Sequence, residues 1–173
     1  FRLPKFSLSF FRTQIAEGSM LPSGKMPYEV FIPAYRDEIL SDTVMVYGNV
    51  DEVELVLNGK TIRRQTADKG PDSDYIPVPN GGNGKNLHFP PFTFYGVPKE
   101  RGVLKAVGYH QGKKVAEYTV KTPGVPERLD ITYFESGKPA TKNDLLIVYV
   151  RMLDKQGVLC PVNGIPVELS VQG

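Results

Sequence analysis

The segment 51–60, which reads Asp-Glu-Val-Glu-Leu-Val-Leu-Asn-Gly-Lys, constrains the fold more than any other part of the chain. Its apolar residues alternate with two glutamates, which is the period of a strand with one buried face and one solvated face. Asn58 and Gly59 follow at once, and this pair favours the positive φ angles that a type I′ turn needs. Residues 60–65 can then return as the partner strand. The segment predicts a β-hairpin that points three side chains into a core: Val53, Leu55 and Leu57.

The whole region 21–121 has the same character. Short strand-like segments are separated by Gly, Pro, Asn and Asp, and none keeps the apolar period of a helix over three turns. Seven short strands of this kind predict an all-β fold, with an immunoglobulin-like β-sandwich over 21–121. The strands are expected at 28–34, 43–47, 53–57, 60–65, 92–95, 103–109 and 114–120.

Residues 1–20 form an apolar segment whose periodicity is ambiguous. Phe6, Leu8 and Phe10 alternate with serines as in a strand, whereas Leu3, Phe6 and Phe10 share one stripe of a helix. The residues alone slightly favour the strand. A small sandwich has no need of so many aromatic side chains, so we expect self-association through residues 1–20 when nothing else covers them.

The sequence 122–126, Thr-Pro-Gly-Val-Pro, predicts an interdomain linker at 122–127. Its prolines stiffen the backbone and remove hydrogen-bond donors, so no strand is expected to run through it. Further strands are expected at 128–134, 145–153 and 166–171. Three strands cannot close a sandwich, so residues 128–173 predict a partial second immunoglobulin-like domain.

Composition narrows the classes of function. The chain has 21 Lys and Arg against 19 Asp and Glu, without a concentrated basic face, so no nucleic-acid partner is predicted. Cys160 is the single cysteine, which excludes an intrachain disulfide and a cysteine-based metal centre. No apolar run approaches the roughly 20 residues of a membrane span. His88 and His110 lack further ligands at close spacing, so neither a metal nor another cofactor is predicted.

The start of the chain also carries an expectation. It opens on Phe1 and shows no signal peptide, as expected of a piece of a longer protein. We expect that longer protein to be periplasmic or secreted.

The carboxylates of the chain lack the setting that glycoside hydrolysis requires. Glu52 and Glu54 share the outer face of one strand, with no flanking aromatic residue to raise either pKa, so both are predicted to be solvated and no catalytic residue is predicted.

The stretch 66–91 is long, polar and rich in Gly, Pro and Asn. A connection of this length is either an insertion without a role, which its composition favours, or a surface facing a substrate or partner. In the second case the candidate sugar-binding residues are Asp72, Asp74, Tyr75 and His88.

Four segments, taken in order, resemble the all-β domain that follows the catalytic barrel in bacterial glycoside hydrolase family 2 enzymes of the β-galactosidase type. They are 51–60, 90–94 (Pro-Pro-Phe-Thr-Phe), 102–109 (Gly-Val-Leu-Lys-Ala-Val-Gly-Tyr) and 122–126. The family usually has a cysteine where this chain has Val50. By the same resemblance, residues 1–20 are similar to the last helix of the preceding barrel, which favours a helix there. Residues 129–173 look like an invasin-type immunoglobulin module.

The resemblance implies a parent enzyme that is a retaining β-galactosidase. Its two catalytic glutamates would lie on barrel strands that have no counterpart in this chain. The chain itself is then expected to be a non-catalytic C-terminal accessory region that gives structural support and helps to orient the substrate. Its implied partner is the preceding barrel of the same polypeptide, with a glycan as a further candidate.

Two alternatives stay open. A stand-alone carbohydrate-binding module would need exposed aromatic platforms, and the chain has no Trp. An adhesin-like array would show repeated similar domains, and the two predicted domains share no obvious repeat.

Overall fold

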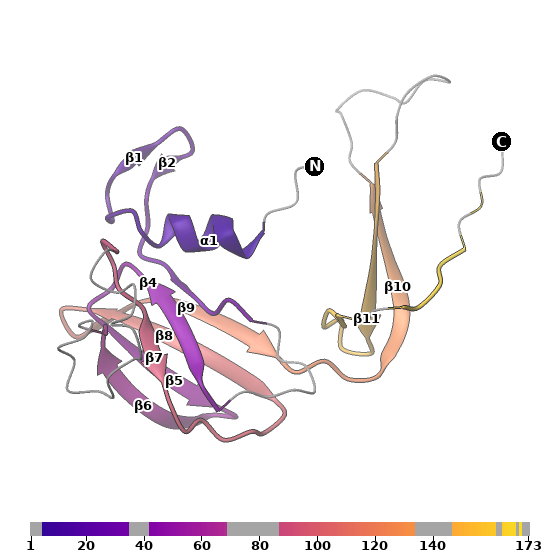
Figure 1. Cartoon of the computed structure of the whole chain (residues 1–173). Helices are drawn as coiled ribbons and strands as arrows, with labels where there is room; N and C mark the ends of the chain where they lie inside the picture. The colour runs from indigo at the N-terminus through magenta and orange to yellow at the C-terminus, as the bar shows by residue number, and fades with distance from the viewer. Residues whose placement is uncertain are drawn as a thin grey trace. The chain divides into compact units, whose positions relative to one another are not determined.

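The computed structural model describes residues 5–34, 42–68, 87–133, 147–161, 164–168 and 170. They divide into two compact units, unit 1 (Phe1–Lys121) and unit 2 (Thr122–Gly173). Figure 1 shows the elements of each unit. The predicted all-β class is confirmed, since strands dominate both units and one short helix precedes them.

Unit 1 is a sandwich of two antiparallel sheets. The larger sheet has the strand order β6-β5-β8-β9, and the smaller has the order β3-β4-β7. The strands of the larger sheet are β5 (Glu52–Leu57), β6 (Lys60–Thr66), β8 (Val103–His110) and β9 (Lys113–Lys121). Those of the smaller sheet are β3 (Val30–Phe31), β4 (Val44–Gly48) and β7 (Phe92–Phe94). The strand predicted over 28–34 is thus much shorter in the structure.

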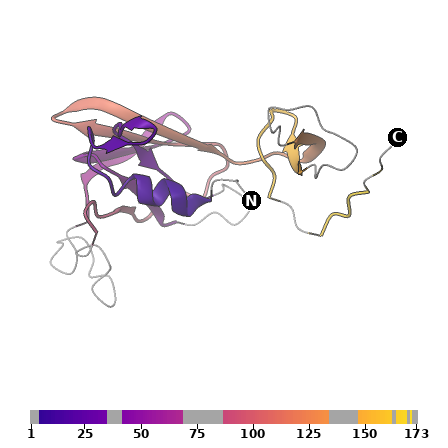
Figure 2. The same ribbon diagram turned by 90° about the horizontal axis from the view of Figure 1, so that it is seen from above.

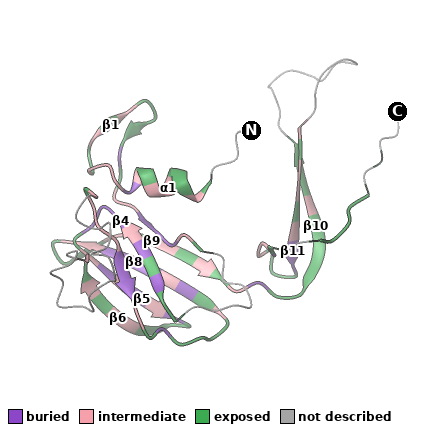
Figure 3. Cartoon of the chain, in the orientation of Figure 1, coloured by how far each residue is buried: buried purple, intermediate pink, exposed green. Residues whose placement is uncertain are grey.

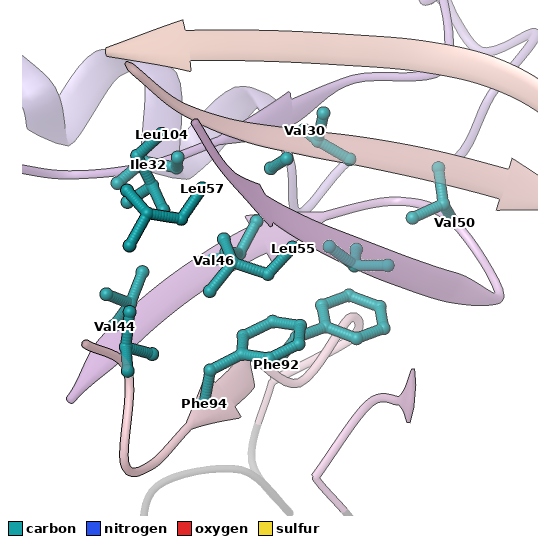
Figure 4. Packing of buried hydrophobic residues seen from close by; sticks show 13 residues of the cluster. Val30, Ile32, Val44, Val46, Val50, Leu55, Leu57, Phe92, Phe94 and Leu104 are labelled. Carbon is teal, nitrogen blue, oxygen red and sulfur yellow. The ribbon is translucent and has the colours of Figure 1, made fainter. Parts of the chain in front are cut away.

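The core of unit 1 lies between these two sheets. Alternate residues of β5 point inward, and Val53, Leu55 and Leu57 are buried as their spacing predicted. Phe92 and Phe94 of β7 meet them from the opposite sheet and are fully buried (Figure 4). Burying side chains of this size contributes about 1.5–3 kcal/mol each.

The predicted turn is present between β5 and β6. Asn58 has a φ of 51° and Gly59 a φ of 80°, the two positive values that a type I′ turn requires. The Asn58 carboxamide has a second role, which the sequence did not reveal. It accepts a hydrogen bond from the Val103 N–H (2.8 Å) and donates one to the Arg101 carbonyl (3.0 Å). The hairpin tip is therefore tied to the beginning of β8.

The N-terminal segment of unit 1 contains helix α1 (Phe6–Arg12), so the helix implied by the family resemblance is confirmed and the strand favoured by alternation is wrong. The helix lies alongside the sandwich (Figure 1, Figure 2). Phe6 packs against Phe31, and Phe10 packs against Tyr47. Phe6 and Phe10 are four residues apart, so they share one face of the helix. In a strand, every second residue would have shared a face instead. A small hairpin of β1 (Met20–Leu21) and β2 (Gly24–Lys25) follows.

The described residues of unit 2 form an antiparallel pair, β10 (Pro126–Tyr133) and β11 (Val148–Asp154). β10 begins inside the stretch predicted as a linker, because Gly124 is already fixed to this unit. The Asp154 carboxylate, which is buried, accepts a hydrogen bond from the Gly124 N–H at 2.6 Å. The third strand expected at 166–171 is not formed at residues 166–168 and 170, the part of that stretch that the structure describes.

Candidate functional site

The candidate sugar-binding residues of the sequence fall on the connection between β6 and β7. His88 lies among the described residues, whereas Asp72, Asp74 and Tyr75 lie outside them. His88 is exposed, and its ring meets the ring of Phe89 edge to face with the centroids 4.5 Å apart. It stands at the C-terminal end of the connection, just before β7.

The described ends of this connection, Asp68 and residues 87–91, are called the neck here. The Asp68 N–H donates to the Pro91 carbonyl at 2.8 Å. Its carboxylate accepts hydrogen bonds from the N–H of Thr93 (3.2 Å) and from the hydroxyl of Thr93 (2.6 Å). The first bond closes the neck, and since Thr93 is buried in β7, the other two anchor the neck to the sandwich.

A second contact reaches the neck from the N-terminal segment. The Gln14 carboxamide donates to the Phe89 carbonyl (3.0 Å) and accepts from the Phe89 N–H (3.1 Å). Sequence reasoning missed Gln14, because a single polar residue 75 positions away from its partner leaves no local signal.

The two glutamates of β5 lie on the outer face of the larger sheet, and both are hydrogen-bonded. Glu54 accepts bonds from the hydroxyls of Thr61 (2.6 Å) and Tyr109 (2.7 Å). These bonds, that from Thr61 foremost, lower the pKa of Glu54 below its usual value. Glu52 pairs with Arg64, whose guanidinium lies 3.8 Å from the centroid of the Tyr109 ring. A glycosidase acid needs a raised pKa, and the pKa of Glu54 is shifted the other way.

His110 occupies the tip of the β8–β9 hairpin. Its ring stacks on Tyr28 with the centroids 4.9 Å apart, and its Nδ1 lies 3.1 Å from Asp51. Asp51 also accepts a hydrogen bond from the Gln111 N–H, and this bond, followed by that of His110, lowers the pKa of Asp51. These contacts fasten the hairpin tip to Tyr28 before β3 and to Asp51 before β5, which is a structural role.

The described residues offer little other chemistry. Nowhere among them do three His, Cys, Asp or Glu side chains gather as a metal site requires. No helix in the described ranges is long and apolar enough to cross a membrane. Cys160 is buried, and its burial raises the pKa of the thiol, which disfavours the reactive thiolate.

Unit 2 has a half-open pocket of about 260 Å³. Its walls are mainly apolar and come from both strands and from the residues after them. The lining includes Leu129, Val150, Met152, Leu159, Ile165 and Val167. None of the described residues that line it is acidic, so this lining offers no carboxylate pair of the kind a glycosidase uses.

Comparisons with known proteins show which families and structures this chain is similar to. A family described as "Domain of unknown function (DUF4982)" matches residues 41–116, within unit 1. The β-galactosidase of Thermoanaerobacter pseudethanolicus is 30% identical over 184 residues, covering 100% of this chain. The β-galactosidase BoGH2A of Bacteroides ovatus is 33% identical over 129 residues, covering 73% of this chain.

Solved structures agree. A glycosyl hydrolase family 2 member from Bacteroides cellulosilyticus is 29% identical, with a TM-score of 0.51 over 68% of this chain and 14% of its own. The chain is similar to a β-sandwich region of glycoside hydrolase family 2 enzymes. A β-glucuronidase of the same family shares the fold, with a TM-score of 0.69 at 22% identity over 92% of this chain and 14% of its own. The chain spans 23% of the length of the T. pseudethanolicus enzyme and 13% of that of BoGH2A.

Proposed function

We propose that this chain is the non-catalytic C-terminal part of a retaining β-galactosidase, where it supports the catalytic barrel and helps to orient the substrate. One observation carries the proposal: the chain is similar over its whole length to a β-galactosidase of which it covers 23%. The described carboxylates are consistent with it, because Glu54 has a lowered pKa and Asp68 is used to anchor the neck.

The supporting role rests on the two sides of α1. On one side Phe6 and Phe10 pack on the sandwich. Arg12, at the C-terminal end of the helix, adds an ion pair with Glu29. On the other side Leu8 and Phe11 are 52% and 64% exposed. A helix that is bound on one side and apolar on the other is suited to connect the sandwich with a second body. We propose that this body is the preceding barrel of the same polypeptide.

The orienting role rests on the neck. It holds His88 at the surface, with an imidazole that can donate or accept a hydrogen bond to a sugar hydroxyl. Asp72, Asp74 and Tyr75 belong to the same connection and remain candidates for the same task. A glycan is the ligand that this proposal implies.

Two measurements test the proposal. The chain alone, incubated with nitrophenyl β-galactoside, should give background hydrolysis. Turnover that a point substitution within the chain abolishes would overturn the non-catalytic assignment.

In the parent enzyme, His88→Ala should raise KM for a natural β-galactoside with little change in kcat, as expected when uniform binding is lost. The matched control is His110→Ala, the other histidine of unit 1, which should leave KM unchanged. Equal KM values for both variants and the wild type would refute the role of His88.

A further inference from the structure

The contact between Gln14 and Phe89 has the form of a strand pair made by a side chain. In an antiparallel sheet, two opposed residues exchange both N–H···O bonds. Here one carboxamide supplies both partners, because its NH₂ group donates to the Phe89 carbonyl and its oxygen accepts from the Phe89 N–H. Both backbone groups of Phe89 are therefore satisfied by one residue of a distant segment.

Gln14 itself stands on a rigid base. Thr13, directly before it, is fully buried, and its hydroxyl donates to the Phe10 carbonyl at 2.7 Å. Ile15, directly after it, has its carbonyl bound by the Asn49 side chain at 3.0 Å. The backbone of Gln14 is thus fixed on both sides, and its side chain extends from a fixed position.

Asn49 connects this N-terminal segment to the sandwich. It is 3% exposed and follows β4 directly. Besides holding Ile15, its side chain donates to the Pro27 carbonyl (3.0 Å) and accepts from the Glu29 N–H (2.6 Å). A buried carboxamide with three hydrogen bonds has one arrangement that satisfies it, so it defines the position of the N-terminal segment.

We infer that Gln14 is a positioning residue for the neck: it fixes the backbone of Phe89 and, through it, the place of the exposed His88. Asp68 anchors the same neck to β7 from the other end. The N-terminal segment, which also carries α1, is therefore coupled to the neck through the chain of contacts Asn49–Ile15–Gln14–Phe89. The coupling concerns the backbone of the neck, and its effect on a sugar rests on the proposed function.

Amide hydrogen exchange, resolved by residue with NMR on the 173-residue chain, tests the inference. Gln14→Ala should speed exchange at the Phe89 amide by roughly 10-fold, as expected for the loss of one hydrogen bond. The amides of β5 and β8 should keep their wild-type rates. The matched control is Ser7→Ala, an exposed position of α1 that should change neither set.

A second variant separates positioning from simple stabilisation. Asn49→Ala alters no residue of the neck, yet the Phe89 amide should exchange faster relative to the β5 amides than in the wild type. An unchanged Phe89 rate in Gln14→Ala, or acceleration shared equally by β5 and β8, would overturn the inference.

In the parent enzyme, Gln14→Ala should raise KM, as His88→Ala is expected to do. If Phe89 exchange accelerates while KM stays at its wild-type value, the positioning of the neck stands and the proposed role of His88 falls.

Discussion

Units 1 and 2 alternate apolar and polar residues in the same way, yet they bury them very differently (Figure 3). Val53 and Leu55 of β5 are 0% exposed, whereas Leu129 and Ile131 of β10 are 45% and 57% exposed. β5 lies between two strands and faces a second sheet. β10 pairs with β11, and the described residues of unit 2 contain no further sheet. Alternation therefore selects a face, and the presence of a second layer decides whether that face is buried.

The apolar face of unit 2 is nevertheless built as a core face. Across the strand pair, side chains that share this face lie opposite one another, as Leu129 with Met152 and Ile131 with Val150. Such cross-strand pairs stabilise a sheet, but two strands alone are only marginally stable in water. Polar contacts add to the stability of unit 2, since Asp154 also accepts hydrogen bonds from the N–H groups of Gln156 (2.9 Å) and Val158 (2.8 Å).

The largest expected effect contrasts the two faces directly. Phe92→Ala in unit 1 should lower the free energy of unfolding by about 3–5 kcal/mol, because it leaves a cavity between two sheets. Ile131→Ala in unit 2 should cost less than about 1 kcal/mol, because more than half of this side chain is exposed. Urea unfolding followed by NMR signals of each unit would measure both. A cost for Ile131→Ala as large as that for Phe92→Ala would show that unit 2 buries this face.

The sequence predicted well those features that depend on neighbours along the chain. The strand 53–57, its turn at Asn58-Gly59 and the returning strand 60–65 follow one another along the chain, and the structure confirms them. The helix at 6–12 was harder to predict from the sequence. Serines between apolar residues produced a strand pattern, and the packing of Phe6 and Phe10 on distant side chains overrides it.

The contacts that shape the candidate site could not be predicted in this way. Gln14, Asn49 and Asp68 are ordinary polar residues in the sequence, and their roles arise from partners up to 75 positions away. Polar residues near turns are usually solvated, so nothing in the sequence singles these three out. The same limit applies to Asn58, whose turn role was evident and whose bonds to Arg101 and Val103 were not.

Backbone strain gives the next effect in size. Gly59→Val should destabilise unit 1 by on the order of 1–3 kcal/mol, because a β-branched residue resists the positive φ at this position. Lys60→Val, at the exposed start of β6, is the matched control and should stay within about 0.5 kcal/mol of the wild type. Unit 2 should be unaffected by either change. A melting transition of Gly59→Val equal to that of the control would contradict the turn geometry.

A pH effect should appear in unit 2. The hydrogen bond from the Gly124 N–H, aided by those from Val158 and Gln156, lowers the pKa of Asp154. A lowered folded-state pKa gives stability that is present above the unfolded value, about 3.9, and is lost as the pH falls through the folded-state pKa. The Gly124 and Val158 amide signals should therefore shift below about pH 4 and stay constant near neutrality. Asp130→Asn, which alters an exposed pair with Arg151, should preserve this titration, and Asp154→Asn should remove it. Persistence of the titration in Asp154→Asn would assign it to another group.

The smallest effect on stability is expected at the exposed side of α1. Leu8 and Phe11 gain little from burial in unit 1, so replacing both with Ser should change the free energy of unfolding by less than about 0.5 kcal/mol. Their exposure should matter for association instead, since apolar groups on a surface favour contact with another copy when the proposed barrel is absent. Light scattering at increasing concentration should show self-association of the wild-type chain and its relief in the double variant. This test is cleaner than deleting residues 1–20, because the deletion also removes Arg12 and Gln14, which bind the sandwich. A double variant that associates like the wild type would show that Leu8 and Phe11 do not mediate the contact. The exposed face of unit 2 that carries Ile131 would then be the surface through which copies associate.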